Sequence, residues 1–340
     1  MKTFTRRRLL QFGASAALIS GTTWSRKVLP QPDPVRSLYE AAKREGTLTY
    51  YASDDVNITE RVIAAFAKVY PGIKINFLRL ASAQMGQRFT AESSARNFAS
   101  DVIQFADPFA FRHAQKEGWL APLTGLPAWQ TFPKSFRTDY WSLIGIAPHT
   151  IITNTQLVSE QHYPKEWTAL LDARWKGQLI LSDPRNNIEV ADWAYTMYKA
   201  YGKEYFTKLK AQNPRWVPSI FPGMQMLAAG DGLAVAPGLH MGTILMQQKG
   251  APLVDFSPSM SSGHETLVSV CAHGAHPNAA RLLVNYLMTR EGQEVYCNEI
   301  AASPLPNIPG SLTLSSEYQR GRYDEAVAMR SELAALLGLS

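Results

Sequence analysis

The stretch Leu48-Thr49-Tyr50-Tyr51 predicts a buried strand, and it ends in the polar loop Ala52-Ser53-Asp54-Asp55. A helix with apolar residues on one face follows, and Pro71-Gly72 stops it. The same order repeats downstream, because residues 101–105 read as another strand and Asp107-Pro108 begins the next helix. Such alternation is typical of parallel α/β units with polar loops at the strand ends.

Further along the chain this alternation is interrupted. Two β-rich stretches, 141–146 and 150–155, follow each other with little helix between them. From Lys165 the alternation restarts with a helix at 167–171, a strand at 178–181 and helices through 188–212. Later segments read as a short strand at 233–235, a helix at 240–249, return strands at 254–256 and 266–270, and a helical tail from Pro277. We therefore expect two α/β lobes joined by β-rich crossings.

Composition excludes some classes of protein. The chain has 340 residues, of which 46% are hydrophobic and 18% are charged, so it can bury a large core and is not disordered. Four of its 34 basic residues lie in the first 25 positions, where there is no acid; the remaining 30 face 28 acidic residues, a net charge of +2. A body so close to neutral lacks the basic surface of a nucleic-acid binder, so we expect no nucleic-acid partner.

The N-terminus has the layout of an export signal. Thr5-Arg6-Arg7-Arg8-Leu9-Leu10-Gln11 precedes an apolar run, residues 12–19, that is too short for the roughly 20 residues of a membrane span. The paired arginines resemble a twin-arginine signal, which implies the twin-arginine export machinery as a partner and a periplasmic location. We assign residues 1–25 to this signal. Cleavage after Ser25, a retained N-terminal anchor and a cytosolic amphipathic helix stay open as alternatives.

Catalytic and metal motifs are missing from the sequence. There is no nucleophile elbow, zincin helix, phosphate-binding glycine loop or dinucleotide fingerprint, so we predict neither an enzyme nor a cofactor. His273 and His276 have a spacing that could hold a metal, but no carboxylate or thiolate cluster completes the site, which favours a turn before a helix. Cys271 and Cys297 are the only cysteines; a disulfide and two buried thiols both remain possible readings.

Several short motifs together resemble one family. They are Leu38-Tyr39-Glu40-Ala41-Ala42-Lys43-Arg44-Glu45-Gly46, Trp167-x-x-Leu170-Leu171-Asp172-x-x-Trp175-Lys176-Gly177, Asp183-Pro184-Arg185, His276-Pro277-Asn278-Ala279-Ala280 and Tyr286-Leu287-Met288-Thr289-Arg290-Glu291-Gly292-Gln293. In this order they resemble the extracellular solute-binding proteins of ABC importers, in the branch that includes ferric-ion and phosphonate binders. The resemblance covers about residues 36–300.

This resemblance implies a type II periplasmic-binding-protein fold, an α/β structure of two lobes with a β-strand hinge. The expected division is a linker at 26–35, lobe 1 at 36–147, lobe 2 at 148–261, and a return to lobe 1 at 262–340 that includes the C-terminal helices. The implied role is a monomeric receptor that passes a small-molecule solute to the transmembrane subunits of an ABC permease. Ferric binders of the branch have adjacent tyrosines near position 237. Here Ala236-Pro237-Gly238-Leu239-His240 has none, which disfavours the iron alternative.

Polar residues at the strand ends predict the ligand site, because ligands of open α/β sheets bind beyond the carboxyl ends of the strands. Arg185 can fork onto a carboxylate or phosphonate, the helix start at Ser82 can bind an anion, and Asp54 or Asp107 can receive an amine. We therefore expect a small organic anion or zwitterion. The competing structural roles are an Arg185–Asp183 brace, a Ser82 helix cap, and a solvated loop or helix N-terminus at Asp54-Asp55. The predicted ligand-binding residues are Ser53, Asp54, Ser82, Asp107, Arg185, Asn186, Asn187 and His240.

Overall fold

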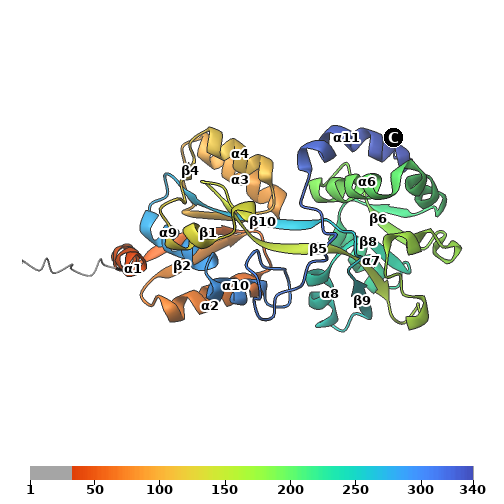
Figure 1. Cartoon of the computed structure of the whole chain (residues 1–340), viewed down its shortest axis with the longest axis horizontal. Coiled ribbons are helices and arrows are strands. Elements are labelled where there is room, and N and C mark those ends of the chain that lie inside the picture. The colour runs from red at the N-terminus through yellow and green to blue at the C-terminus, as the bar shows by residue number, and fades with distance from the viewer. Residues whose placement is uncertain (1–32, 340) are drawn as a thin grey trace, which may run out of the picture. The chain divides into compact units, whose positions relative to one another are not determined.

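The structure is a computed structural model that describes residues 33–339 (Figure 1). The predicted signal, residues 1–25, and most of the 26–35 linker lie outside the described residues. Among the described residues, no helix combines the length and the apolar character that crossing a membrane requires. The strands are β1 Thr47–Ala52, β2 Lys74–Arg79, β3 Val102–Phe105, β4 Leu120–Ala121, β5 Ser142–Asn154, β6 Leu179–Ser182, β7 Arg215–Val217, β8 Ala234–Leu239, β9 Leu253–Phe256 and β10 Gly263–Cys271. The α-helices are α1 Pro34–Glu45, α2 Val56–Val69, α3 Ser82–Ser94, α4 Pro108–Lys116, α5 Pro127–Thr131, α6 Ile188–Ala211, α7 Ile220–Ala228, α8 His240–Gln247, α9 Pro277–Leu287, α10 Arg290–Cys297 and α11 Tyr323–Leu336.

Lobe 1 is built on the parallel strands β2, β1 and β3, with β10 antiparallel to β3. Neighbouring residues of a strand point to opposite faces of the sheet, so Tyr50 and Tyr51 enter two different cores. Tyr50 packs with apolar residues of α2 and α9, whereas Tyr51 packs with residues of α3 and α4. Figure 1 shows α3 and α4 on one face of the sheet and α2 and α10 on the other.

Lobe 2 repeats the arrangement with β6 parallel to both β7 and β8. One core fills it, and Trp167, Trp175 and Trp193 are almost completely buried there. Helices α6 and α7 follow β6 and β7, as expected for parallel α/β units. The short strand β7 was not expected, and the helix predicted at residues 167–171 is present as a 3-10 helix.

One long strand, β5, passes from lobe 1 into lobe 2. The prediction of two separate β-rich stretches was wrong, since residues 142–154 form a single strand of 13 residues. Pro148 caused the apparent break in the pattern. It lies where β5 changes partners, because residues 142–148 pair with β10 and residues 149–154 pair with β8 and β9.

We call the region where β5 and the start of β10 join the two lobes the crossing. The strand registers place the ends of the parallel strands of both lobes next to it. In lobe 1, Phe105 at the end of β3 pairs with Leu267 in the middle of β10, so the first half of β10 extends beyond β3. In lobe 2, Leu239 at the end of β8 pairs with His149. The carboxyl ends of the parallel strands therefore reach the region where β5 and the start of β10 join the lobes.

The C-terminal segment differs from the expected division, which placed all of 262–340 in lobe 1. Helices α9 and α10 do pack into a core of lobe 1. Residues 298–322 are not helical, and α11 then packs against α6 in lobe 2, where Ala326, Leu333 and Leu337 are buried. The chain therefore passes between the lobes a third time, a step that the helical pattern of the tail did not show.

Candidate functional site

The topology brings all eight predicted residues to the two strand-end edges that flank the crossing. In lobe 1, Ser53 and Asp54 follow β1, Ser82 follows β2, and Asp107 follows β3. In lobe 2, residues 185–187 follow β6, and His240 follows β8. Their individual contacts show which of them are already engaged within their own lobe.

Asp54 is buried and belongs to a polar network inside lobe 1. Its carboxylate accepts a hydrogen bond of 2.7 Å from the Gln104 side-chain amide, and Gln104 in turn accepts one of 3.0 Å from the Tyr50 hydroxyl. Burial raises the pKa of the Asp54 carboxyl, although hydrogen bonds from Tyr296 and Gln104 and the charge of His264 oppose that effect. A solvated loop at this position is therefore wrong for Asp54. The neighbouring Asp55 caps α2, which agrees with the alternative of a helix N-terminus at Asp54-Asp55.

The other three residues of lobe 1 have different roles. Asp107 caps α4 by accepting hydrogen bonds from the amides of Phe109 and Ala110. Ser82 does not cap its helix; its hydroxyl accepts a 3.2 Å hydrogen bond from the Ala106 amide, and α3 begins without a side-chain cap. The buried Ser53 hydroxyl has no hydrogen-bond partner among the described residues.

In lobe 2, the loop after β6 is braced by its own side chains. The Arg185 guanidinium forks onto the Asp183 carboxylate, with Nε and Nη2 at 3.1 and 2.8 Å from Oδ2. Asn187 caps α6 by accepting a 2.7 Å hydrogen bond from the Glu189 amide, and the Asn186 amide donates to the Asp183 carbonyl. The brace that competed with ligand binding at Arg185 is therefore present.

His240, the first residue of α8, pairs with Asp255 of β9. Its Nδ1 lies 2.9 Å from the carboxylate, and this hydrogen bond raises the pKa of the imidazole despite partial burial. The charge and backbone carbonyl of Glu299, in lobe 1, act in the same direction. His240 therefore reaches from lobe 2 toward lobe 1.

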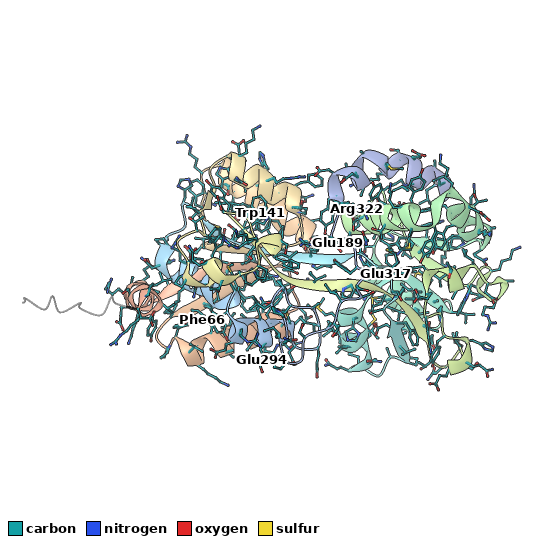
Figure 2. All side chains as sticks on the ribbon, viewed as in Figure 1. Phe66, Trp141, Glu189, Glu294, Glu317 and Arg322 are labelled. Carbon is teal, nitrogen blue, oxygen red and sulfur yellow. The ribbon has the colours of Figure 1, made fainter. Side chains whose placement is uncertain are left out.

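The sequence analysis missed a pair at the crossing itself. His264, the second residue of β10, places Nδ1 at 2.8 Å from the Glu189 carboxylate of α6. Figure 2 shows Glu189 beside β10, between the helices of the two lobes. Glu189 stands two residues after Asn187, so the strand-end argument could have included it. No local pattern marks His264 as its partner, because the two residues are 75 positions apart.

The structure also decides the question of the two cysteines, which the sequence left open. Cys271 and Cys297 are both free and buried, so they form no disulfide. His276 binds the Asp101 carboxylate through Nδ1 at 2.9 Å, next to the start of α9. Residues 33–339 contain no group of three or more His, Cys, Asp or Glu side chains that could hold a metal ion.

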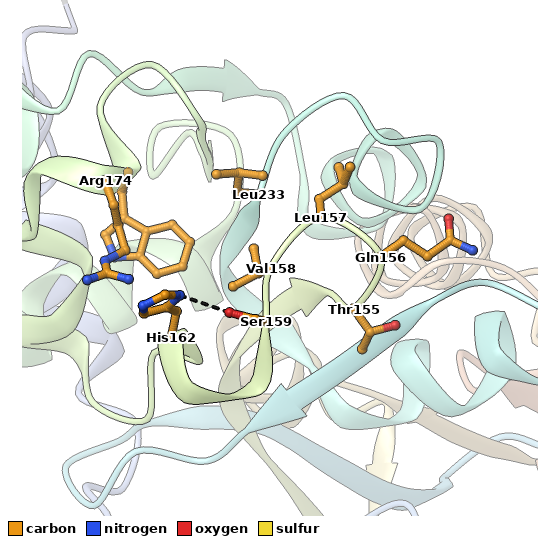
Figure 3. A pocket seen from close by; sticks show the side chains of 9 residues that line it. Thr155, Gln156, Leu157, Val158, Ser159, His162, Arg174 and Leu233 are labelled. Carbon is orange, nitrogen blue, oxygen red and sulfur yellow. Dashed lines mark hydrogen bonds between the residues drawn. The ribbon is translucent and has the colours of Figure 1, made fainter.

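A separate pocket of about 500 Å³ lies in lobe 2 (Figure 3). It is lined by residues 155–159, which follow the far end of β5, by Leu233, which precedes β8, and by His162, Arg174 and Trp175. Both strand ends belong to the edge of the sheet opposite the crossing. This pocket therefore does not share an edge with the predicted ligand residues.

The arrangement of two lobes with facing strand ends agrees with a comparison of sequences. A family model described as bacterial extracellular solute-binding protein matches residues 98–320, well over half of the chain. The chain belongs to this family. It is a solute-binding protein of the ABC-importer type, and the family consists of binding proteins rather than enzymes.

Individual relatives are more distant. An uncharacterized protein of Haemophilus influenzae is 26% identical over 271 residues, which cover 75% of this chain and 76% of the relative. Iron-bound HitA of Pseudomonas aeruginosa is 16% identical with a TM-score of 0.66, covering 84% of this chain and 99% of that one. AfuA of Actinobacillus pleuropneumoniae, solved with fructose-6-phosphate, is 20% identical with a TM-score of 0.66, covering 87% and 100%. These likenesses establish the type II periplasmic-binding-protein fold.

Proposed function

We propose that this protein is a periplasmic, monomeric receptor that captures a small organic anion or zwitterion of the carboxylate, phosphate or phosphonate type. The lobes close on the ligand about β5 and β10, and the closed form delivers it to the transmembrane subunits of an ABC permease. Closure of this kind requires only that the ligand bind the closed form better than the open form.

The observation that carries the ligand class is a pair of open helix N-termini, one on each lobe. Helix α3 of lobe 1 and helix α8 of lobe 2 both begin at a strand end beside the crossing, and neither has a side-chain cap. Amides at a helix start favour negative charge. The helix α4, by contrast, already has the Asp107 carboxylate at its N-terminus, so its amides are occupied.

Groups near these helices fit the two ends of a zwitterion. The Ser53 hydroxyl can donate to an oxyanion, whereas the Asp54 carboxylate suits an ammonium group. Arg185 acts in this proposal as a brace that shapes the loop, because Asp183 already uses its fork. Iron binding has less support from the sequence, because Ala236-Pro237-Gly238-Leu239-His240 has no tyrosine where ferric binders of the branch have adjacent tyrosines.

The first experiment identifies the ligand. Native purification followed by mass spectrometry should release a small anion or zwitterion, and calorimetry should reproduce its binding to stripped protein. Parallel titrations with Fe³⁺ and with an aminophosphonate separate the two ligand classes. Tight binding of Fe³⁺ alone would overturn the proposed class.

A pair of variants then tests the α3 amides. Ala81, which precedes the helix, is extended, so proline is compatible with the first helical position, where it removes one amide donor. Ser82→Ala loses the same hydroxyl but keeps that amide. We expect Ser82→Pro to bind the identified ligand about tenfold more weakly than Ser82→Ala, which is about 1.4 kcal/mol. Equal affinities would remove the α3 N-terminus from the site.

Export completes the proposed role, with residues 1–25 as a twin-arginine signal. The double variant Arg6→Lys, Arg7→Lys should accumulate in the cytoplasm, as cell fractionation and immunoblotting would show. Its full appearance in the periplasm would contradict the twin-arginine assignment.

A further inference from the structure

A partly buried histidine of β10 pairs with a carboxylate of lobe 2 and is subject to the charge of a carboxylate of lobe 1. His264 lies at the start of β10, and its Nδ1 bonds the carboxylate of Glu189 on α6 of lobe 2 at 2.8 Å. The charge of Asp54, which follows β1 in lobe 1, also acts on the ring. The side chains of His264 and Glu189 are only 21% and 9% exposed.

We propose that the protonated His264 ring holds the two lobes together from inside, between Glu189 and Asp54, so that loss of its proton loosens the lobes. The proposal rests on the proposed function only in placing this bridge at the ligand site. Its test uses ligand-free protein, and its failure would leave the ligand class and the transport role untouched.

The charge balance around the ring explains why the proton matters. With the proton, one cation balances the carboxylates of Glu189 and Asp54, whereas the adjacent Glu265 has its own cation in Arg320. Without it, acidic groups of both lobes remain near each other in a region with little water, where their repulsion is weakly screened. The neighbouring His149 cannot replace the missing charge, because its complete burial lowers its pKa to about 4 and keeps the ring neutral.

The direction of the pH response follows from the pKa of His264. Burial by itself would lower this pKa, but the charge and hydrogen bond of Glu189, together with the charge of Asp54, raise it to about 8 from the ordinary 6.5. Because the pKa is raised in the folded protein, the stabilisation is complete below about pH 6.5 and disappears as the pH rises through about 8. The loosening therefore belongs to alkaline pH.

Two other groups in the crossing titrate and must be separated from His264. The pKa of the buried Asp192 carboxyl rises to about 6 because of burial, so it changes charge below the window of interest. His240 also links the lobes, through Asp255 on β9 and Glu299 in lobe 1, and its pKa is raised. A His240→Gln variant therefore accompanies the test.

The test measures the distance between the lobes by pulsed electron paramagnetic resonance. Spin labels on Lys68→Cys and Lys199→Cys report on lobes 1 and 2 from exposed positions. The native Cys271 and Cys297 are buried, and burial raises the pKa of each thiol to about 12, which protects them from labelling. Labelled ligand-free protein is compared from pH 6 to pH 9.

We expect the distance distribution to broaden toward longer distances with a midpoint near pH 8. The His264→Gln variant should be broad at every pH, and the His240→Gln variant should keep most of the response. His162→Gln is the matched control, because this exposed ring contacts Ser159 at the far edge of lobe 2. A pH-independent distribution in the parent, or a full response in His264→Gln, would overturn the proposal.

A second variant keeps the test decisive should His264→Gln fail to fold. Glu189→Gln retains the ring and removes the partner that most raises its proton affinity. The midpoint should then fall by about one pH unit or more, a loss of at least about tenfold in proton affinity. An unmoved midpoint contradicts the bridge.

Discussion

Among the ion pairs that residues 33–339 form between the lobes, one lies inside the crossing and another at its exposed edge. The inner pair, His264–Glu189, is mostly buried, whereas the outer pair, Arg112 of α4 with Asp324 of α11, is 45% and 65% exposed. The outer pair has the better geometry, with two parallel hydrogen bonds of 2.7 and 2.8 Å. Exposed pairs nevertheless contribute little, because water and salt screen them. We therefore expect the buried pair to contribute more to the contact between the lobes than the exposed pair, although the exposed pair has the better hydrogen-bond geometry.

The largest effect in this comparison is expected at the buried Glu265 carboxylate of β10. Its side chain is 6% exposed, and Arg320 of the third crossing donates to it through Nε at 2.5 Å. Arg320→Ala leaves this carboxylate without a cation, which should cost about 3 kcal/mol in the free energy of unfolding. Urea denaturation measures the loss. The double variant Arg320→Ala, Glu265→Gln should recover part of it, and a single-variant loss below about 1 kcal/mol would place Glu265 in contact with water.

A smaller effect is expected where β10 begins, at the crossing. A Cβ atom at Gly263 would lie 2.4 Å from the Ala147 carbonyl oxygen on β5. Relieving this clash requires a shift of the β5 backbone, which costs free energy. Gly263→Ala should therefore lower the free energy of unfolding by about 1–3 kcal/mol. The control is Gly86→Ala within α3, where the nearest atoms are 3.5 Å away. Helix propensity predicts that this control gains up to about 1 kcal/mol. Equal free energies of unfolding for the two variants would show that the backbone at the crossing can move to accommodate the Cβ atom.

The smallest effect is expected for the exposed pair of Arg112 and Asp324. Arg112→Ala should change the free energy of unfolding by less than about 1 kcal/mol, and added salt should reduce the difference further. Thermal unfolding at low and high ionic strength gives both quantities. A loss as large as that of Arg320→Ala would reverse the comparison and make the exposed pair the stronger contact.

Much of the fold followed from local sequence patterns. The strand at Leu48, the helix stopped by Pro71-Gly72 and the Asp107 cap of α4 all appear in the structure. Such features depend on hydrogen bonds and side-chain periods within a few residues, so a single sequence contains them. The Arg185–Asp183 brace is equally local, and it was open as an alternative for that reason.

The contacts between the lobes came only from tertiary structure. Two stretches interrupted by Pro148 form one strand, and α11 crosses back to pack on α6, because burial of apolar surface outweighs the local signals. Glu189 and His264 meet because tertiary packing places the start of α6 beside β10. The sequence by itself determined the α/β lobes, the strand ends and the family. Tertiary structure alone decided which charged groups face each other across the crossing, because strand registers and interlobe packing depend on contacts between residues far apart in the chain.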